Sequence, residues 1–340
     1  PTFGPILDLL KSDNHNELSL QTYLMRVIQV KLKLQNIVSS ANPQAMAQQL
    51  AKSVFQGTSV DLTETRDYGN LIAANLGEEW SGFGYSVFKR PLEQAWQVIL
   101  TPAAKSFNDT WRDAIVYSWE QSFAGRYPFK NTNNDASLAE LARFIRPDSG
   151  IIDRFIQSEL TGILIKQGDK WVVDTVNSEG LNFSHDFLNT LQLFNQLATQ
   201  IFENGDAKIE FDLMARSGHN IVKSELVINK QKLTYFNQMP TWKRMRWPGN
   251  DYSAYSQLSW NTGETGLKLY QYYAGDWAWI RLLESAEIRQ IDNSRFELKW
   301  QVEQNQKLKY ILRTQTGAGP INLLKLRNFQ LPKSVFETNF

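Results

Sequence analysis

The feature of this sequence that most constrains its fold is a change of hydrophobic period near residue 205. Before that point, apolar residues recur every three or four positions; between Phe107 and Phe123 they are each four apart. After it, as in residues 208–213, apolar and charged residues alternate, so we expect Asp212 to face solvent. This change predicts an α+β fold, with an N-terminal all-helical domain followed by a C-terminal antiparallel β-sandwich-like domain.

With 340 residues, the chain is longer than one hydrophobic core usually organises, and we expect it to be divided. The predicted parts are a helical domain (1–182, with a small hairpin near 163–176), a connecting helix (183–204), a β-sandwich domain (205–332, with one inserted helix near 276–287) and an extended tail (333–340). In the helical domain, Thr101-Pro102 predicts a helix start, because proline suits the first helical turn. The glycines of Ser81-Gly-Phe-Gly84 predict an interhelical loop.

Charge and composition exclude several classes of function. With 36 basic and 35 acidic residues the net charge is +1, which gives no long-range attraction to nucleic acid or to anionic lipid. The absence of cysteine excludes disulfides, thiolate metal sites and cysteine nucleophiles. No apolar run approaches the roughly 20 residues needed to span a bilayer, so we expect no membrane segment in this fragment. The start at Pro1 suggests a piece of a longer protein.

Motifs for catalysis are weak. The three histidines, His15, His185 and His219, have no partner at a metal-binding spacing, and neither a nucleophile elbow nor a phosphate-binding loop occurs. We therefore predict no catalytic residue, no metal site and no cofactor. Paired carboxylates could still catalyse glycoside hydrolysis, and the sequence alone does not measure their separation.

A basic and aromatic stretch, Trp242-Lys-Arg-Met-Arg-Trp-Pro-Gly249, fits a nucleic-acid patch. A structural interpretation fits it better, since Pro-Gly marks a turn and guanidinium groups often stack on neighbouring aromatic rings. The neutral net charge also argues against nucleic acid.

A second aromatic stretch, Tyr273-Ala-Gly-Asp-Trp-Ala-Trp-Ile-Arg-Leu-Leu-Glu284, could be a sugar subsite, a base-stacking platform or a buried helix. Its apolar residues would cover nearly every face of a helix, which favours burial of Trp277 and Trp279. Arg281 must then find a carboxylate or carbonyl groups, because an unpaired buried charge is strongly destabilising. We interpret Arg281 as a structural tie packed by the tryptophans.

Six short motifs, taken in order, carry a resemblance. They are Arg126-Tyr-Pro-Phe129, the Asp135–Phe144 helix, Gly150-Ile-Ile-Asp-Arg-Phe155, Trp247-Pro-Gly249, Gly275-Asp-Trp-Ala-Trp-Ile-Arg-Leu-Leu283 and Leu326-Arg-Asn-Phe-Gln-Leu-Pro332. Together they resemble the C-terminal periplasmic region of the IcmF/TssM proteins of bacterial type VI secretion systems. The chain departs from the family at Asp276, where proline is usual, and at Leu331, where cysteine is usual, and its Asp135–Phe144 helix lacks the usual aromatic pattern.

The resemblance implies a scaffold and no enzyme. It places the segment in the periplasm, as the C-terminal part of an inner-membrane-anchored protein. The implied partners are the outer-membrane lipoprotein TssJ, the inner-membrane protein TssL and further copies in a multi-copy ring. A periplasmic glycan-binding or glycan-cleaving enzyme is the alternative. The motif residues that we expect to be structural are Arg126, Tyr127, Pro128, Phe129, Trp247, Pro248, Gly249, Trp277 and Arg281.

We predict docking residues from their type and location, because loops at one end of a sandwich, exposed aromatic residues and arginines are common contact points in protein interfaces. The candidates are Lys243, Arg244, Arg246, Asn250, Asp251, Tyr252 and Tyr255. An ordinary solvated loop is an equally good interpretation of these residues.

Overall fold

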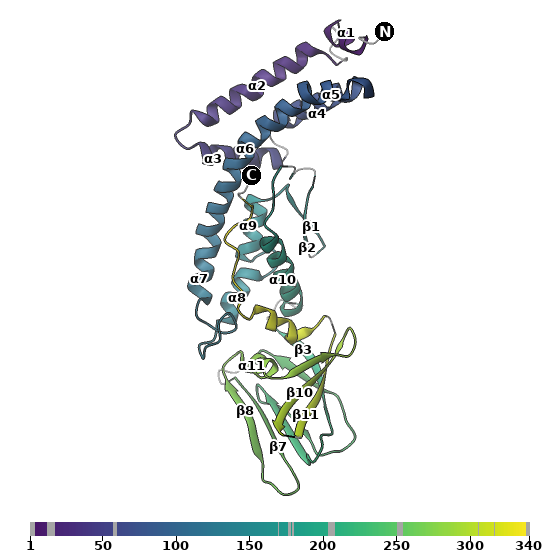
Figure 1. Ribbon diagram of the computed structural model, residues 1–340. Coiled ribbons are helices and arrows are strands. Elements are labelled where there is room, and N and C mark those ends of the chain that lie inside the picture. The colour runs from purple at the N-terminus through teal and green to yellow at the C-terminus, as the bar shows by residue number, and fades with distance from the viewer. Residues whose placement is uncertain are drawn as a thin grey trace. The chain divides into compact units, whose positions relative to one another are not determined.

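A computed structural model describes residues 4–11, 18–56, 60–168, 170–175, 178, 180–202, 208–249, 254–304, 306–315 and 317–337. The chain forms two compact units, each assembled from separate stretches of sequence (Figure 1). The first comprises Pro1–Val116, Arg154–Leu191 and Pro332–Phe340, and the second comprises Tyr117–Asp153 and Gln192–Leu331.

The first unit is helical apart from one small hairpin. Its elements are α1 (Gly4–Lys11), α2 (Leu20–Val38), α3 (Pro43–Phe55), α4 (Val60–Asn75), the 3₁₀ turn η1 (Glu78–Trp80), α5 (Ser81–Gly84), the π-helical η2 (Tyr85–Lys89), α6 (Arg90–Trp111), the π-helical η3 (Arg112–Val116), α9 (Ile151–Glu159, from its fourth residue), β1 (Leu164–Gln167), β2 (Lys170–Val173) and the start of α10 (His185–Ile201). Asn42 caps α3: its side chain accepts a hydrogen bond from the Ala45 N–H, and Pro43 follows at the first helical position. The β1–β2 hairpin lies inside the predicted range 163–176.

Two predictions in this unit are wrong. Helix α6 begins at Arg90 rather than at Thr101, and Pro102 lies inside it. The helix tolerates this proline because the flanking residues Ile99, Leu100, Ala103 and Ala104 are fully buried and offset the one lost backbone hydrogen bond.

Residues 81–84 form helix α5 and not an interhelical loop. A Cβ on Gly84 would lie 3.2 Å from the Cα of Ala73 in α4. The glycine therefore serves close helix–helix approach rather than loop flexibility.

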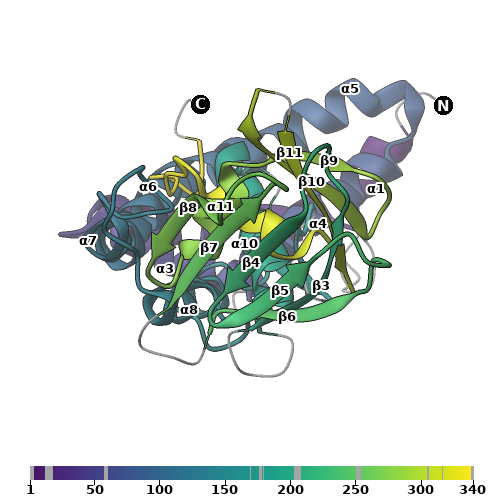
Figure 2. The same ribbon diagram turned by 90° about the horizontal axis from the view of Figure 1, so that it is seen from below.

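The second unit combines short helices with a β-sandwich. Its elements are α7 (Tyr117–Phe123), α8 (Leu138–Ile145), the end of α10, β3 (Ile209–Arg216), β4 (Lys223–Ile228), β5 (Gln231–Tyr235), β6 (Lys243–Trp247), β7 (Tyr255–Asn261), β8 (Lys268–Ala274), α11 (Ala278–Glu284), β9 (Glu287–Gln290), β10 (Arg295–Glu303), β11 (Gln306–Thr314) and the 3₁₀ helix η4 (Gly319–Leu326). Two antiparallel sheets have the strand orders β6-β3-β11-β10-β9 and β5-β4-β7-β8. Figure 2 shows the second sheet as β8, β7, β4 and β5 side by side. The α+β class is confirmed, and β4–β5, β7–β8 and β10–β11 each form an antiparallel hairpin.

Alternation along the strands produces the sandwich core. In β10 the alternate residues Phe296, Leu298 and Trp300 are buried, and β11 buries Tyr310 and its neighbours on the same face, with Ile311 buried as well. The ring centroids of Trp300 and Tyr310 are 5.7 Å apart. Trp279 of α11 stacks on Phe211 of β3, with centroids 5.7 Å apart and the rings nearly parallel. Asp212 keeps the predicted alternation but is not exposed to solvent as expected: it is 8% exposed, because arginines on both neighbouring strands cover it.

The helical part of the second unit has an aromatic core of its own. Trp119 of α7, which is nearly fully buried, forms the centre of this core. The rings that contact Trp119 are Phe123, Phe129, Phe144, Phe194 and Phe329. Arg-Tyr-Pro-Phe and the last family motif thus contribute one phenylalanine each to the same cluster.

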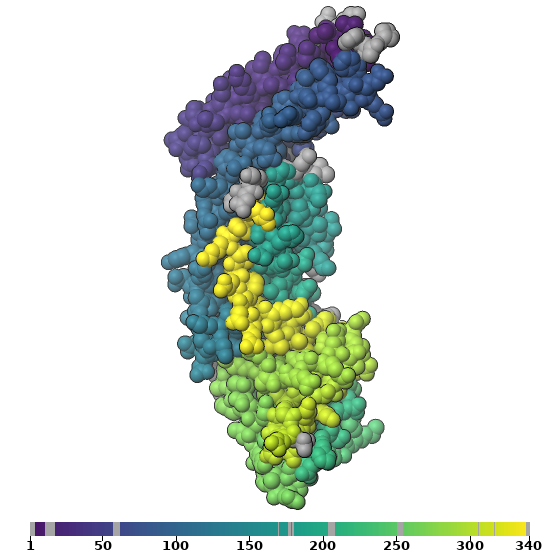
Figure 3. Space-filling view, viewed as in Figure 1, coloured from purple at the N-terminus to yellow at the C-terminus, as the bar shows by residue number. Residues whose placement is uncertain are grey.

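Residues 332–337 belong to the first unit, and two of them lie in its core. Val335 and Phe336 are fully buried, and the Oδ1 atom of Asn108 accepts hydrogen bonds from both backbone N–H groups at 2.7 and 2.9 Å. The Nδ2 atom of Asn108 donates to the Phe336 carbonyl at 2.9 Å. In Figure 3 this segment, coloured yellow, lies between the blue and the teal helical segments. One buried asparagine therefore satisfies three backbone groups of the segment that was predicted as a tail.

Candidate functional site

The most elaborate polar arrangement in the second unit surrounds Arg281 of α11. Its Nη2 atom lies 2.6 Å from the Oδ1 atom of Asp135, and its guanidinium carbon lies 3.7 Å from the centroid of the Tyr127 ring. The Arg281 and Asp135 side chains are 10% and 20% exposed. Arg281 therefore has the carboxylate partner that its burial demands, with an aromatic face beside it.

The entry into α11 shapes the other side of Asp135. Gly275 has a φ of +99°, and a Cβ at this position would collide with the Asp135 carboxylate. The Asp135 Oδ2 atom accepts a hydrogen bond from the Trp277 backbone N–H at 3.3 Å. The Trp277 indole N–H donates to the Ala136 carbonyl at 2.7 Å. Glycine is thus required where the loop before α11 approaches the aspartate.

A second tryptophan, Trp247 of the Trp-Pro-Gly motif, contacts the loop that leads into α11. The Trp247 indole N–H donates to the Asp276 carbonyl at 2.7 Å, and the Trp247 and Trp277 ring centroids are 5.5 Å apart. The Trp247–Pro248 and Tyr127–Pro128 peptide bonds are both cis. Motifs far apart in the sequence therefore meet around Trp277, which is fully buried.

The polar network continues beyond the Tyr127 ring. The Tyr127 hydroxyl donates to Glu284 at 2.8 Å, and Glu284 lies 2.9 Å from Arg327. Burial, together with the hydrogen bond to Glu284, raises the pKa of Tyr127 far above its ordinary value, so its hydroxyl stays protonated. Cations and carboxylates alternate along this network, and each carboxylate named is paired with an arginine.

Asp276 is the other carboxyl group beside this cluster. Burial and the nearby Asp135 carboxylate raise its pKa. Because Asp135 is paired with Arg281, these two acids differ from a pair poised for glycoside hydrolysis, in which both carboxyl groups face a substrate.

The structure brings most of the predicted structural residues together. Tyr127, Trp247, Trp277 and Arg281 lie in the cluster, while Arg126 is exposed. Pro128 and Pro248 follow the two cis bonds, Phe129 packs on Trp119, and Gly249 lies against Asn229, whose Cβ would be 2.6 Å from a Cβ at the glycine.

Sequence reasoning did not single out Asp135 and Glu284 as members of the cluster. Arg281 indicated that some carboxylate was needed, but 35 acidic residues were available and Asp135 is 146 positions away. The only sequence feature that pointed to Asp135 as the partner of Arg281 was its position at the start of a family motif.

The predicted docking residues divide into two groups. Lys243, Arg244 and Arg246 lie on β6, an edge strand of the five-stranded sheet. The Gln231 side chain accepts from the Arg246 N–H at 2.9 Å and donates to the Arg246 carbonyl at 2.8 Å, which covers part of this edge. Lys243 donates to the Lys232 carbonyl.

Of the four docking candidates in and beside the 250–255 loop, only Tyr255 lies within the described residues. Asn250, Asp251 and Tyr252 lie outside the described residues. Tyr255 is half-buried, and its ring stacks on Tyr272 at a centroid distance of 5.6 Å. A shared docking site made of these residues stays a prediction.

The tryptophans that suggested a stacking platform are buried or covered by a neighbouring side chain. Trp277 and Trp279 are fully buried, and Trp247 is as well. The Arg313 guanidinium lies 4.2 Å from the centroid of the Trp242 ring. None of these four tryptophans offers both faces to a sugar or a base.

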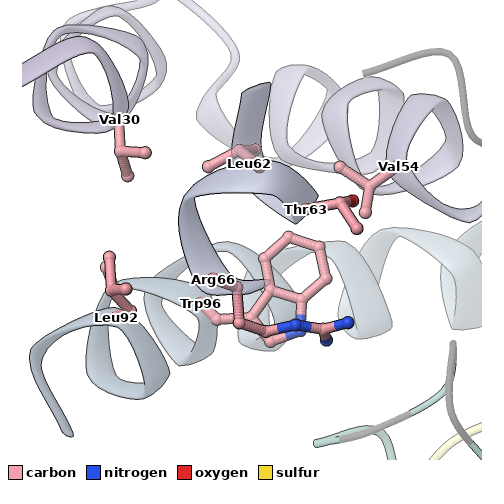
Figure 4. A pocket seen from close by; sticks show the side chains of 8 residues that line it. Val30, Val54, Leu62, Thr63, Arg66, Leu92 and Trp96 are labelled. Atoms are coloured by element: carbon pink, nitrogen blue, oxygen red, sulfur yellow. The ribbon is translucent and has the colours of Figure 1, made fainter. Parts of the chain in front are cut away.

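A small cavity lies in the first unit, among α2, α3, α4 and α6. Its volume is about 30 Å³, enough for roughly one or two water molecules. Figure 4 shows the mainly apolar side chains that line it, including Val30, Leu62 and Leu92. Over the ranges described, no group of acidic and histidine side chains is arranged to hold a metal ion, and none of the helices there has the length and apolar character that crossing a membrane requires.

Comparison with known proteins identifies the class to which this fold belongs. Residues 102–207 match the family model of the type VI secretion protein IcmF helical domain, and residues 211–316 match the IcmF C2-like domain. The chain belongs to the IcmF/TssM family of type VI secretion proteins.

Individual relatives agree with this assignment. The type VI secretion system component TssM1 of Pseudomonas aeruginosa is 23% identical over 235 residues, which cover 66% of this chain and 21% of that protein. The chain thus spans about a fifth of that curated relative's length.

Solved structures cover more of the chain. A chain of a type VI secretion system membrane core complex is 48% identical, with a TM-score of 0.85 and coverage of 98% of this chain and 70% of that one. A chain of a type VI membrane complex is also 48% identical, with a TM-score of 0.90 and coverage of 99% and 71%. The C-terminal domain of the T6SS protein TssM from EAEC is 42% identical, with a TM-score of 0.67, and covers 69% of this chain and 100% of that one. The homology supports a role in a type VI secretion membrane complex.

Proposed function

We propose that this chain is a periplasmic scaffold segment of the type VI secretion membrane complex, linking the inner membrane to an outer-membrane lipoprotein. The observation that carries the proposal is the 48% identity, over nearly the whole chain, to chains of two type VI membrane complexes. The family resemblance supports the periplasmic placement.

The Arg281 cluster supports a mechanical role. It joins segments that are 146 residues apart through an ion pair, a cation–π contact and indole hydrogen bonds, which makes that part of the second unit stiff. A scaffold requires such stiffness. A glycan-cleaving enzyme would require two carboxylates free to face substrate, whereas Asp135 and Glu284 are each paired with arginine.

In this proposal the exposed surfaces bind the partners. TssJ is the partner for the end of the sandwich that carries Tyr255 and the β6 edge, where Arg244 has a side chain that is 56% exposed. Arginine and tyrosine are enriched among residues that dominate protein interfaces. TssL and further copies of the protein complete the proposed assembly.

The direct test is retention of the purified chain by the immobilised periplasmic part of its cognate lipoprotein. We expect a stable complex at micromolar concentration. The double substitution Tyr252→Ala with Tyr255→Ala should weaken binding by about tenfold or more if the loop is a hot spot. Tyr117→Ala is the control, because Tyr117 is an exposed tyrosine on α7.

The outcomes separate the parts of the proposal. Unchanged affinity of the double variant excludes the loop, and the charge reversals Lys243→Glu and Arg246→Glu then test the β6 edge. If the unaltered chain does not bind the lipoprotein at all, the link to the outer membrane is rejected. Release of soluble fragments from purified cell-wall glycan would instead support the enzyme alternative.

A further inference from the structure

The outward face of the five-stranded sheet is strongly basic. Residues on this face alternate with the buried residues of β3, β6, β9, β10 and β11. The nine cations among them are Arg216, Arg244, Arg246, Arg289, Arg295, Lys299, Lys307, Lys309 and Arg313. The five carboxylates are Glu210, Asp212, Glu287, Glu297 and Glu303. These strand positions therefore carry a net charge of +4, against +1 for the whole chain.

One part of this face is neutralised internally. Arg244 and Arg313 lie on either side of Asp212 and donate to its carboxylate at 3.1 and 2.8 Å. Arg289 pairs with Glu297 at 2.8 Å, and Arg295 pairs with Asp292 of the preceding turn at 2.6 Å. Because these arginines are already paired with carboxylates, this part of the face offers little net positive charge to a binding partner.

The other part holds cations that face one another. Across neighbouring strands, Arg216 of β3 is directly opposite Lys309 of β11, and Lys309 is directly opposite Lys299 of β10. Lys307 lies two residues from Lys309 on β11, on the same face. We call Arg216, Lys299, Lys307 and Lys309 the basic row. Like charges directly opposite each other destabilise a sheet, so folding alone does not favour this arrangement.

Carboxylates compensate the basic row only in part. Lys299 lies 2.8 Å from Glu297, and Lys307 lies 3.7 Å from Glu287. Throughout the described ranges, no ion pair involves Arg216 or Lys309. Unneutralised like charges on adjacent strands are a feature that an anionic partner would stabilise.

We propose that the basic row binds the surface of an anionic phospholipid bilayer. The row lies on a sheet face, which presents its cations at about 5 Å between strands and about 7 Å along a strand. A shallow array of this kind can contact several lipid phosphates at once. Three of its four cations are lysines, which bind phosphate as point charges.

Two other anionic partners fit the face less well. Lysine is depleted in protein–protein interfaces, which are enriched in aromatic anchors. The highly exposed apolar residues Met239 and Leu269 lie in the β5–β6 connection and on β8, and neither belongs to the strands that carry the basic row. Single-stranded nucleic acid is bound by aromatic rings beside the cations, but Trp242 is covered by Arg313.

This inference goes beyond the proposed function and does not depend on the lipoprotein. It is tested by co-sedimentation of the 340-residue chain with vesicles of phosphatidylcholine containing about 30 mol % phosphatidylglycerol. We expect binding to these vesicles, none to vesicles of phosphatidylcholine alone, and loss of binding as NaCl rises from about 0.05 to about 0.5 M.

A triple substitution locates the binding surface. Arg216→Gln, Lys307→Gln and Lys309→Gln together should lower the partition coefficient roughly tenfold or more. The matched control, Lys31→Gln, Lys105→Gln and Lys130→Gln, removes the same charge from exposed positions outside the basic row and should bind like the unaltered chain. Removing the facing cations should also leave the thermal midpoint unchanged or raise it, so lost binding would not reflect unfolding.

Three results would overturn the inference. Equal loss of binding by both triple variants would show a general charge effect. Equal binding to neutral and anionic vesicles would exclude phosphate recognition. Absence of vesicle binding, together with salt-sensitive retention on DNA or on an acidic protein that the basic-row variant loses, would assign the face to that partner instead.

Discussion

The Arg281 guanidinium is held between the Asp135 carboxylate, at 2.6 Å, and the face of the Tyr127 ring, at 3.7 Å. Each contact comes from a different family motif. The arrangement explains how a charged residue fits into α11, whose residues Ala278, Ile280 and Leu282 are all fully buried. Charge and ring together replace the water that a buried guanidinium loses.

Removal of the carboxylate should destabilise the protein strongly. We expect Asp135→Asn to lower the free energy of unfolding by about 3 kcal/mol or more, because it leaves Arg281 buried without a counter-charge. Urea denaturation monitored by tryptophan fluorescence measures this. Glu140→Gln, in the exposed pair with Arg143, should change stability by about 0–1 kcal/mol. Similar losses in the two variants would contradict the assigned role of Asp135.

The two buried tryptophans of the α11 region should respond differently to substitution by phenylalanine. The Trp277 indole N–H has a carbonyl partner, whereas the Trp279 indole N–H has no hydrogen-bond partner in the described structure. Trp277→Phe should therefore cost about 1 kcal/mol more than Trp279→Phe, since only the first leaves a buried acceptor unpaired. Denaturation midpoints compare the variants, and the reverse order would refute the interpretation.

Gly275 should not tolerate a side chain. Gly275→Ala places a Cβ against Asp135 in a backbone conformation that favours glycine, and we expect a loss of about 2 kcal/mol or more. Gly82→Ala is the control: its Cβ would meet open space in helix α5, so stability should rise by about 0.5–1 kcal/mol. Differential scanning calorimetry distinguishes the two, and a neutral Gly275→Ala would show that the loop can shift.

Asp212 should make stability sensitive to acid. Burial acts to raise its pKa, but hydrogen bonds from Arg313 and Arg244 outweigh it and hold the pKa below its ordinary value. A lowered pKa means that the contribution of Asp212 to stability is fully present above the unfolded-state value and is lost as the pH falls through the folded-state value. Stability measured from pH 6 down to pH 2 should therefore decline less steeply in Asp212→Asn. Parallel curves for both proteins would exclude Asp212 as a source of the decline.

The fold could be predicted from the sequence wherever its signals were local. The helical period placed the buried aromatic face from Phe107 to Phe123, and period 2 placed β10 and β11, since each pattern reflects a local stretch of chain with one buried side. The prediction that Pro102 starts a helix was wrong, because burial of the surrounding residues overrode a local preference. Asp212 lies on the outward face, as the alternation predicts, but the arginines that cover it lie on other strands and could not be predicted from its neighbours.

The sequence by itself determined the α+β class, the hairpin within residues 163–176 and the burial of Trp277 with Arg281. Only the tertiary structure decided which of 35 acidic residues pairs with Arg281 and how the charges are distributed. A count of charges gives +1, but strand register places Arg216, Lys309 and Lys299 opposite one another. Periodicity depends on neighbours along the chain, whereas ion pairs and charged faces depend on register between strands that are distant in sequence.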